Sequence, residues 1–168
     1  MATQISSLSC TIDPFQLSDF PVMVKYIEAI QEHERIAVPI LKSGREIGAD
    51  YARFLIRAVA DRNGCILMAR IDTVTVGFGC AWVQEDDDPL IQEDARTHAY
   101  VSDVFVEQAW RRQGIGLQLL VALETEMRSR GCRLIRICSK ATNSLALACY
   151  QKAGYSPYEV VFAKRLDL

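Results

Sequence analysis

The sequence lacks any uninterrupted apolar run of the length that crosses a bilayer, about 20 residues, so no membrane-spanning helix is expected. Its first ten residues, MATQISSLSC, have no basic stretch followed by a hydrophobic core, so a secretory signal is not expected. A large excess of charge of either sign is also missing. With 19 Lys and Arg against 21 Asp and Glu, the net charge is −2, and a nonspecific nucleic-acid-binding surface is not expected.

Metal-ligand patterns are absent as well, so no metal is expected. The two histidines, His33 and His98, lie far apart in the sequence. The six cysteines lack the paired spacing of a zinc site: Cys10, Cys65, Cys80, Cys132, Cys138 and Cys149. We interpret them as reduced, mostly buried thiols of a cytoplasmic protein, with Cys149 the nearest of them to the site predicted below.

The most informative segment is YVSDVFVEQAWRRQGIG, residues 100–116, in which a β-rich apolar run precedes a glycine-containing turn and an amphipathic helix. Backbone N–H groups at a helix start are unpaired and the macrodipole is positive there, so such a turn binds phosphate. Gly114 and Gly116 leave room for a close anion, and Arg111 and Arg112 add positive charge. The turn lacks the Lys-Ser/Thr of a Walker loop and the spacing of a dinucleotide fingerprint.

Arg111-x-x-Gly114-x-Gly116 resembles the coenzyme A pyrophosphate loop of the GNAT acetyltransferase superfamily, whose pattern is Arg/Gln-x-x-Gly-x-Gly/Ala. Residues 143–155 resemble a second signature of that family, Asn-x-x-Ala-x-x-x-Tyr-x-x-x-Gly-Phe/Tyr. The two signatures occur in the family order with a predicted strand, 134–138, between them. The resemblance covers residues 100–155 closely and the remainder only in element order.

The order of predicted elements is β-α-α-β-β-β-α-β-α-β in a single domain, residues 1–168. Ahead of the central segment we expect a strand at 5–12, helices at about 19–35 and 48–61 with a loop at 38–48 between them, a hairpin of strands 65–71 and 74–83, and an acidic loop at 84–97. Strands flanked by helices indicate an α/β or α+β protein. The resemblance implies the GNAT fold, a mixed, mostly antiparallel sheet whose fourth and fifth strands splay apart.

The resemblance also implies an acetyl-CoA-dependent N-acetyltransferase that acts on a primary amine, most simply of a small molecule, by direct transfer in a ternary complex. Its coenzyme-binding residues would be Val104, Phe105 and Val106 through their backbones, the turn Arg111, Arg112, Gln113, Gly114, Ile115 and Gly116, and Asn143. For Asn143, capping of the following helix is a sufficient alternative explanation.

Tyr150 matches the family tyrosine near the coenzyme sulfur. A phenol with a pKa of ~10 is a weaker acid than a thiol at ~8.5, so a hydrogen bond to the departing sulfur is a safer role than full proton transfer. Asp103 is the candidate general base, with Glu107 a weaker one, and deprotonation of the amine through water and backbone carbonyls is the alternative. Without a chemical role, Tyr150 would pack against the sheet and Asp103 would be a hydrogen-bonded strand residue.

Several alternatives stay open. The alternative acceptor is a protein N-terminus or a lysine, and the rival from another class is a coenzyme A-binding module without turnover. The loop 38–48 is the expected wall of the acceptor pocket. The acidic runs 85–88 and 93–94 would either attract a cationic acceptor or form a solvated loop. Residues 155–166 leave little room for two final strands, so the last strand is very short or pairs with another subunit. A homodimer is expected on the resemblance alone.

Overall fold

The computed structural model describes residues 9–166. Its helices and strands are β1 Cys10–Pro14, α1 Phe20–Ala37, α2 Gly44–Asp61, β2 Cys65–Ile71, β3 Val74–Glu85, α3 Glu93–Arg96, β4 Thr97–Val106, α4 Ile115–Ser129, β5 Ile135–Ile137 and α5 Ser144–Lys152. Short 3-10 turns precede α1 and follow β4. Within residues 9–166, no helix combines the length and apolar character that a membrane span requires.

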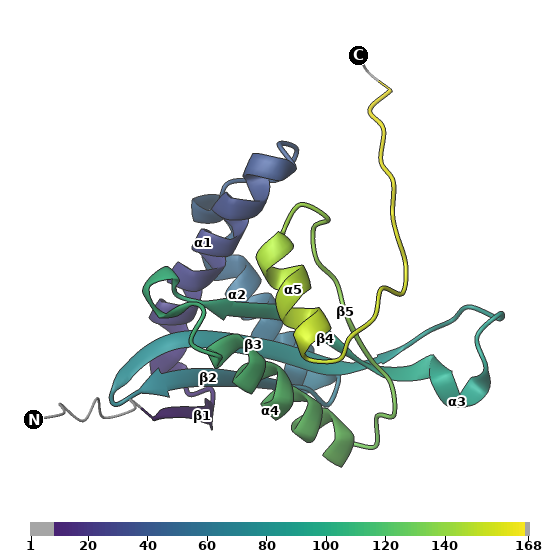
Figure 1. Cartoon of the computed structure of the whole chain (residues 1–168), viewed down its shortest axis with the longest axis horizontal. Helices are drawn as coiled ribbons and strands as arrows, with labels where there is room; N and C mark the ends of the chain where they lie inside the picture. Colours follow the sequence, from purple (N-terminus) through teal and green to yellow (C-terminus); the bar gives the residue numbers. More distant parts are fainter. Residues whose placement is uncertain (1–8, 167–168) are drawn as a thin grey trace, which may run out of the picture.

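The five strands form one sheet in the order β1-β2-β3-β4-β5 (Figure 1). Every neighbouring pair is antiparallel except β4 and β5, which are parallel and are joined through α4. The predicted hairpin is confirmed as β2 and β3, and Asp72 takes a positive φ of 53° in its tight turn. The mixed, mostly antiparallel sheet expected from the resemblance is therefore confirmed.

Helices cover both faces of the sheet, so its central strands are apolar on both sides. One face packs against α1 and α2 through a cluster that includes Tyr26, Leu55, Met68, Phe78 and Trp82. The other face packs against α4 through a cluster that includes Leu67, Val76, Val101, Leu119 and Leu123. Neighbouring residues of one strand enter different clusters because successive side chains point to opposite faces. Each face of the sheet therefore has its own apolar cluster, one covered by α1 and α2 and the other by α4.

The connection between α1 and α2 is shorter than predicted, because α2 begins at Gly44 rather than Gly48. Ser43 caps the helix: its Oγ accepts from the Glu46 N–H at 3.3 Å and the Glu46 carboxylate accepts from the Ser43 N–H at 2.9 Å. The Ser-x-x-Glu spacing of this capping box is a sequence signal for a helix that begins at Gly44. Gly44 and Gly48 face α1, where a Cβ on Gly44 would overlap the Glu28 backbone.

The two ends of the chain also differ from the prediction. Residues 5–8 of the first predicted strand lie outside the described residues, and β1 continues through Pro14, which an edge strand tolerates. The acidic loop contains a short helix, α3. Between residues 153 and 166 no strand forms, so the final predicted strand is missing. That segment runs away from the sheet as an extended tail (Figure 1).

Candidate active site

The parallel pairing of β4 with β5 is short and ends early. It joins Ala99 to Ile135 and continues only to Val101 opposite Ile137. Because β4 runs on to Val106, residues 102–106 have no partner on the β5 side within the described chain. Backbone N–H and C=O groups on that side are therefore available to a ligand. This opening corresponds to the predicted splay of the fourth and fifth strands.

A β-bulge shapes β4 at the start of this opening. Cys80 pairs with Asp103 and Ala81 with Val101, so Ser102 is an extra residue on β4. Both Ser102 and Asp103 consequently line the same cavity, although adjacent strand residues normally face opposite sides. The Ser102 Oγ donates to the Asp103 Oδ2 at 2.7 Å. Bulges often redirect side chains next to active sites, and this one places the Ser102 hydroxyl and the Asp103 carboxylate in the same cavity.

The cavity beside the bulge has a volume of about 240 Å³. Its lining comes from four segments: Ile27, Ile30, Gln31 and Glu34 of α1, Ile47 and Tyr51 of α2, Tyr100, Ser102 and Asp103 of β4, and Cys138, Ser139 and Lys140 after β5. The α1 residues recur at helical spacing along one face. Of the predicted loop 38–48, Ile47 lines the cavity, but it belongs to helix α2. Residues 38–43, which join the two helices, contribute no lining residue.

Asp103 has an unusual environment for a carboxyl group. Burial raises its pKa from 3.8 to about 6, against the lowering effect of hydrogen bonds from Ser102 and from the Tyr51 hydroxyl, which donates at 3.2 Å. The Glu34 carboxylate raises the pKa further. A carboxylate with a pKa near 6 is ionised at neutral pH and is a stronger base than an ordinary aspartate. Asp103 is thus suited to accept a proton in the cavity.

The predicted phosphate-binding turn lies where β4 ends and α4 begins. Arg112 and Gly114 have positive φ angles of 64° and 83°. Turns in which left-handed and right-handed residues alternate direct successive N–H groups into a concave anion site. Within residues 9–166, the N–H groups of residues 112–117 donate to no acceptor. A Cβ on Gly114 would meet nothing within 4 Å, so the space over the turn is open. The turn retains the donors that the sequence predicted.

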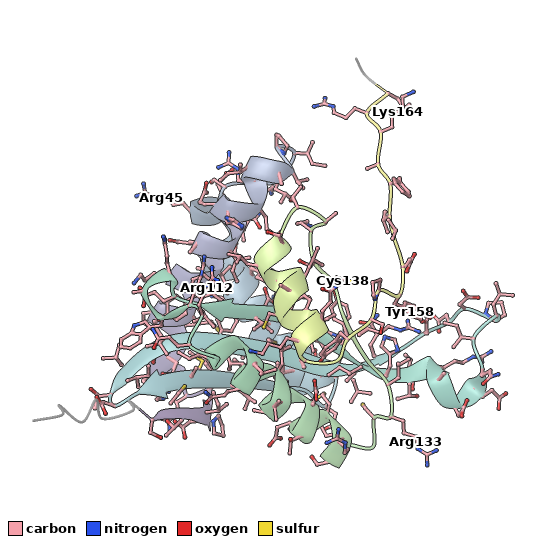
Figure 2. All side chains as sticks on the ribbon, viewed as in Figure 1. Arg45, Arg112, Arg133, Cys138, Tyr158 and Lys164 are labelled. Carbon is pink, nitrogen blue, oxygen red and sulfur yellow. The ribbon has the colours of Figure 1, made fainter. Side chains whose placement is uncertain are left out.

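Arg111 is partly engaged within the protein. Its Nε donates to the Val106 carbonyl at 2.9 Å, and its guanidinium lies 5.7 Å from the centroid of the Phe105 ring. This contact fastens the turn to the last residues of β4. Arg112 and Gln113 remain exposed to solvent beside it. Of the two arginines predicted at the turn, Arg111 is therefore bonded to the β4 backbone, whereas Arg112 projects into solvent (Figure 2).

Helix α5 carries the second signature. The Asn143 Oδ1 accepts from the Ala146 N–H at 3.2 Å, which confirms the capping role. Burial raises the pKa of Tyr150 to about 12, and the neighbouring Cys149 and Asp103 raise it in the same direction. The Tyr150 hydroxyl has no hydrogen-bond partner within residues 9–166. A protonated, unpartnered phenol is available to donate to a ligand.

Sequence reasoning missed most of the cavity. The sequence pattern points only to Asp103, because Glu34, Tyr51 and Lys140 come from distant segments whose approach no local pattern shows. The acidic loop contributes no lining residue from the described chain. His98 is buried, with its Nδ1 3.1 Å from the Arg96 carbonyl.

The cysteines divide differently from the prediction. Cys80 and Cys132 are buried as expected, but Cys138 is exposed and lines the cavity from the loop after β5 (Figure 2). Cys149, predicted to be the cysteine nearest the site, lies beside the phosphate-binding turn. Its Sγ would be 3.5 Å from a Cβ on Gly116. Burial raises the pKa of the Cys149 thiol, which disfavours a nucleophilic role.

Comparison with known sequences finds related acetyltransferases. The family model described as Acetyltransferase (GNAT) family matches residues 27–155. An aminoglycoside N(6')-acetyltransferase type 1 of Stenotrophomonas maltophilia is 28% identical over 115 residues, which cover 68% of this chain and 74% of that protein. An uncharacterized N-acetyltransferase of Bacillus subtilis (strain 168) is 28% identical over 88 residues, which cover 52% of this chain and 53% of that protein.

Solved structures show the same fold. The aminoglycoside N-acetyltransferase AAC(6')-Iy, determined in complex with CoA, has a TM-score of 0.69 at 17% identity, over 95% of this chain and 96% of that one. A Bacillus halodurans protein, determined as a tetramutant, has a TM-score of 0.79 at 17% identity, over 93% of this chain and 99% of that one.

Proposed function

The chain belongs to the GNAT acetyltransferase family and is an N-acetyltransferase, and from that premise we propose that it moves the acetyl group of acetyl-CoA to a primary amine of a small molecule. The observation that carries the proposal is the unpaired stretch of β4, residues 102–106, between the phosphate-binding turn and the cavity that holds Asp103. A relative named for aminoglycosides supports a small-molecule acceptor. We assign the whole chain, residues 1–168, to this one domain.

Coenzyme A is proposed to lie along the opening between β4 and β5. Its pyrophosphate would accept from the N–H groups of residues 112–117, with the exposed Arg112 adding charge. Its pantetheine arm would add to the free edge of Val104, Phe105 and Val106 through backbone hydrogen bonds. Asn143, at the start of α5, would flank the arm while it caps the helix.

The proposed chemistry is direct transfer in a ternary complex. Asp103, directly or through water, takes a proton from the ammonium group of the acceptor, and the amine nitrogen then attacks the thioester carbonyl carbon. The carbon–sulfur bond breaks and the CoA thiolate leaves. Tyr150 donates a hydrogen bond to that thiolate, because full proton transfer from a phenol of pKa about 12 to a thiolate of ~8.5 is uphill by about 5 kcal/mol.

Release of free thiol from acetyl-CoA by the purified protein tests the proposal, across alkyl amines, polyamines, aminoglycosides, amino acids and peptides with free N-termini. Turnover with a small amine supports it. Turnover with peptides alone would move the acceptor class to proteins. Coenzyme binding without turnover of any acceptor would indicate a binding module, and no binding of coenzyme at all would refute the assigned turn.

The protein is further proposed to act as a cytoplasmic homodimer that binds neither nucleic acid nor membrane. Six free cysteines fit a reducing compartment, and a net charge of −2 does not favour nucleic acid. The extended tail exposes the large apolar side chains of Val160, Val161 and Phe162, which favours burial against a second copy.

A further inference from the structure

An ion pair lies at the rim of the cavity. The Lys140 Nζ is 3.5 Å from the Glu34 Oε2, and the two side chains retain 41% and 28% of their exposure. Both residues line the cavity, one from the loop after β5 and the other from α1. Ion pairs with this much exposure contribute little to stability, so a competing cation readily replaces the lysine. Glu34 is therefore a carboxylate that holds an ammonium group at the mouth of the acceptor site.

The helices next to this carboxylate contribute three isoleucines, with Gln31 beside them. Ile27 and Ile30 precede Glu34 on the same face of α1, and Ile47 faces the cavity from α2. Ile30 is one helical turn before Glu34, a rise of about 6 Å along the helix. The second carboxylate of the cavity, Asp103, belongs to β4, and the Glu34 carboxylate raises its pKa. The cavity thus combines two acidic groups with a patch of three isoleucines, among polar residues such as Gln31, Tyr51 and Ser139.

We propose that the preferred acceptor is an aliphatic di- or polyamine, whose reacting amine meets Asp103 while a second ammonium group displaces Lys140 from Glu34. This inference rests on the proposed function and identifies the residue that selects the acceptor. The methylene spacer of such an amine matches the three isoleucines, and its two positive charges match the two carboxylates.

Lys140 acts in this arrangement as an internal competitor. Its own side chain is an alkyl ammonium, the chemical group that Glu34 is proposed to bind in the acceptor. Removal of Glu34 and removal of Lys140 should therefore change diamine recognition in opposite directions. A purely structural ion pair between α1 and the 138–140 loop would behave differently, because loss of either partner would loosen the same contact.

The test compares 1,4-diaminobutane with butylamine, which share four methylenes and differ in one ammonium group. For Glu34→Gln, the ratio of kcat/KM for the diamine to that for the monoamine should fall about tenfold, chiefly through KM of the diamine. For Lys140→Met, the same ratio should rise about threefold. Asp50→Asn is the control, since it removes an exposed carboxylate of α2 outside the cavity and should leave the ratio unchanged.

Calorimetric titration of 1,4-diaminobutane into the CoA-bound protein provides a second readout that needs no turnover. Wild-type protein should bind the diamine more tightly than butylamine, and Glu34→Gln should remove that preference. Equal shifts for both amines, or a fall in the ratio for both substitutions, would overturn the role of Glu34. Absence of thiol release with every amine would instead reject the proposed function itself.

Discussion

At the scale of single residues, Asp103 occupies a position that favours chemistry over stability. Its carboxyl accepts hydrogen bonds from Tyr51 of α2 and Ser102 of its own strand, and it shares the cavity with Glu34, Tyr100 and Lys140. Burial makes the ionised form unfavourable, which is why its pKa rises to about 6. The same environment that makes the group a better base therefore destabilises the folded protein at neutral pH.

Replacement of Asp103 by Asn should stabilise the protein above pH 6. The native state binds this proton more tightly than the unfolded chain between pH 3.8 and about 6, so wild-type stability falls as pH rises through that window. The variant avoids this loss and should gain about 1–3 kcal/mol at pH 7.5. Thermal unfolding at pH 7.5 and 4.5 measures it, and turnover should fall at least tenfold. A variant that is less stable at pH 7.5 would contradict the assignment.

Tyr150→Phe should lower kcat at least tenfold and leave the Kd for CoA within threefold of wild type. The hydroxyl is protonated at neutral pH because its pKa is about 12, and its donor is lost in the variant. Thiol release and calorimetry measure the two quantities. Tyr155→Phe is a matched control, with its ring centroid 6.2 Å from that of Tyr150. Undiminished turnover in Tyr150→Phe would remove this residue from the mechanism.

At the scale of elements, the pair α1–α2 is held at close range by glycines. Gly44 and Gly48 both face Glu28, but they meet different parts of it. A Cβ on Gly44 would overlap the Glu28 backbone, which cannot move without displacing α1. A Cβ on Gly48 would lie 2.7 Å from the Glu28 Cγ, an atom of a flexible side chain. A substitution at Gly44 therefore tests the distance between the helices, whereas a substitution at Gly48 mainly tests helix propensity.

Gly44→Ala should destabilise the protein by about 2 kcal/mol, because the two helices must separate. Gly48→Ala should have an effect within about 1 kcal/mol of zero, since rotation of the Glu28 side chain is offset by the better helix propensity of alanine. Urea denaturation of both variants measures the difference. Equal effects of the two substitutions would show that α1 and α2 do not pack as closely as described.

At the scale of the whole molecule, the elements near the two signatures were predictable and the cavity was not. Gly114 and Asn143 report local backbone geometry, a positive φ and a helix cap, which a short sequence window encodes. The extra residue Ser102 depends on pairing with β3, and the approach of Glu34 to Lys140 depends on how α1 docks. Such features arise only when distant segments pack, so no periodicity shows them.

The extended tail carries the exposed apolar side chains that are proposed to form the dimer contact. The described chain leaves the body at Tyr158, whose ring lies 4.5 Å from the Arg136 guanidinium, and then exposes Phe162 at 92%. Truncation after Tyr158 should convert the proposed dimer to a monomer, because it removes this apolar surface but retains the contact with Arg136. Light scattering after gel filtration measures the mass. An unchanged mass for the truncated protein would place any dimer contact elsewhere.

The two sides of the candidate site share little of the chain. Helices α1 and α2 with residues 138–140 line the proposed acceptor cavity, whereas the turn before α4 and the helix α5 carry the coenzyme signatures, and β4 belongs to both. Mutations on the α1–α2 side can therefore alter which amine is acetylated without disturbing the donor. New substrate preferences can evolve, or be selected in the laboratory, one helix face at a time.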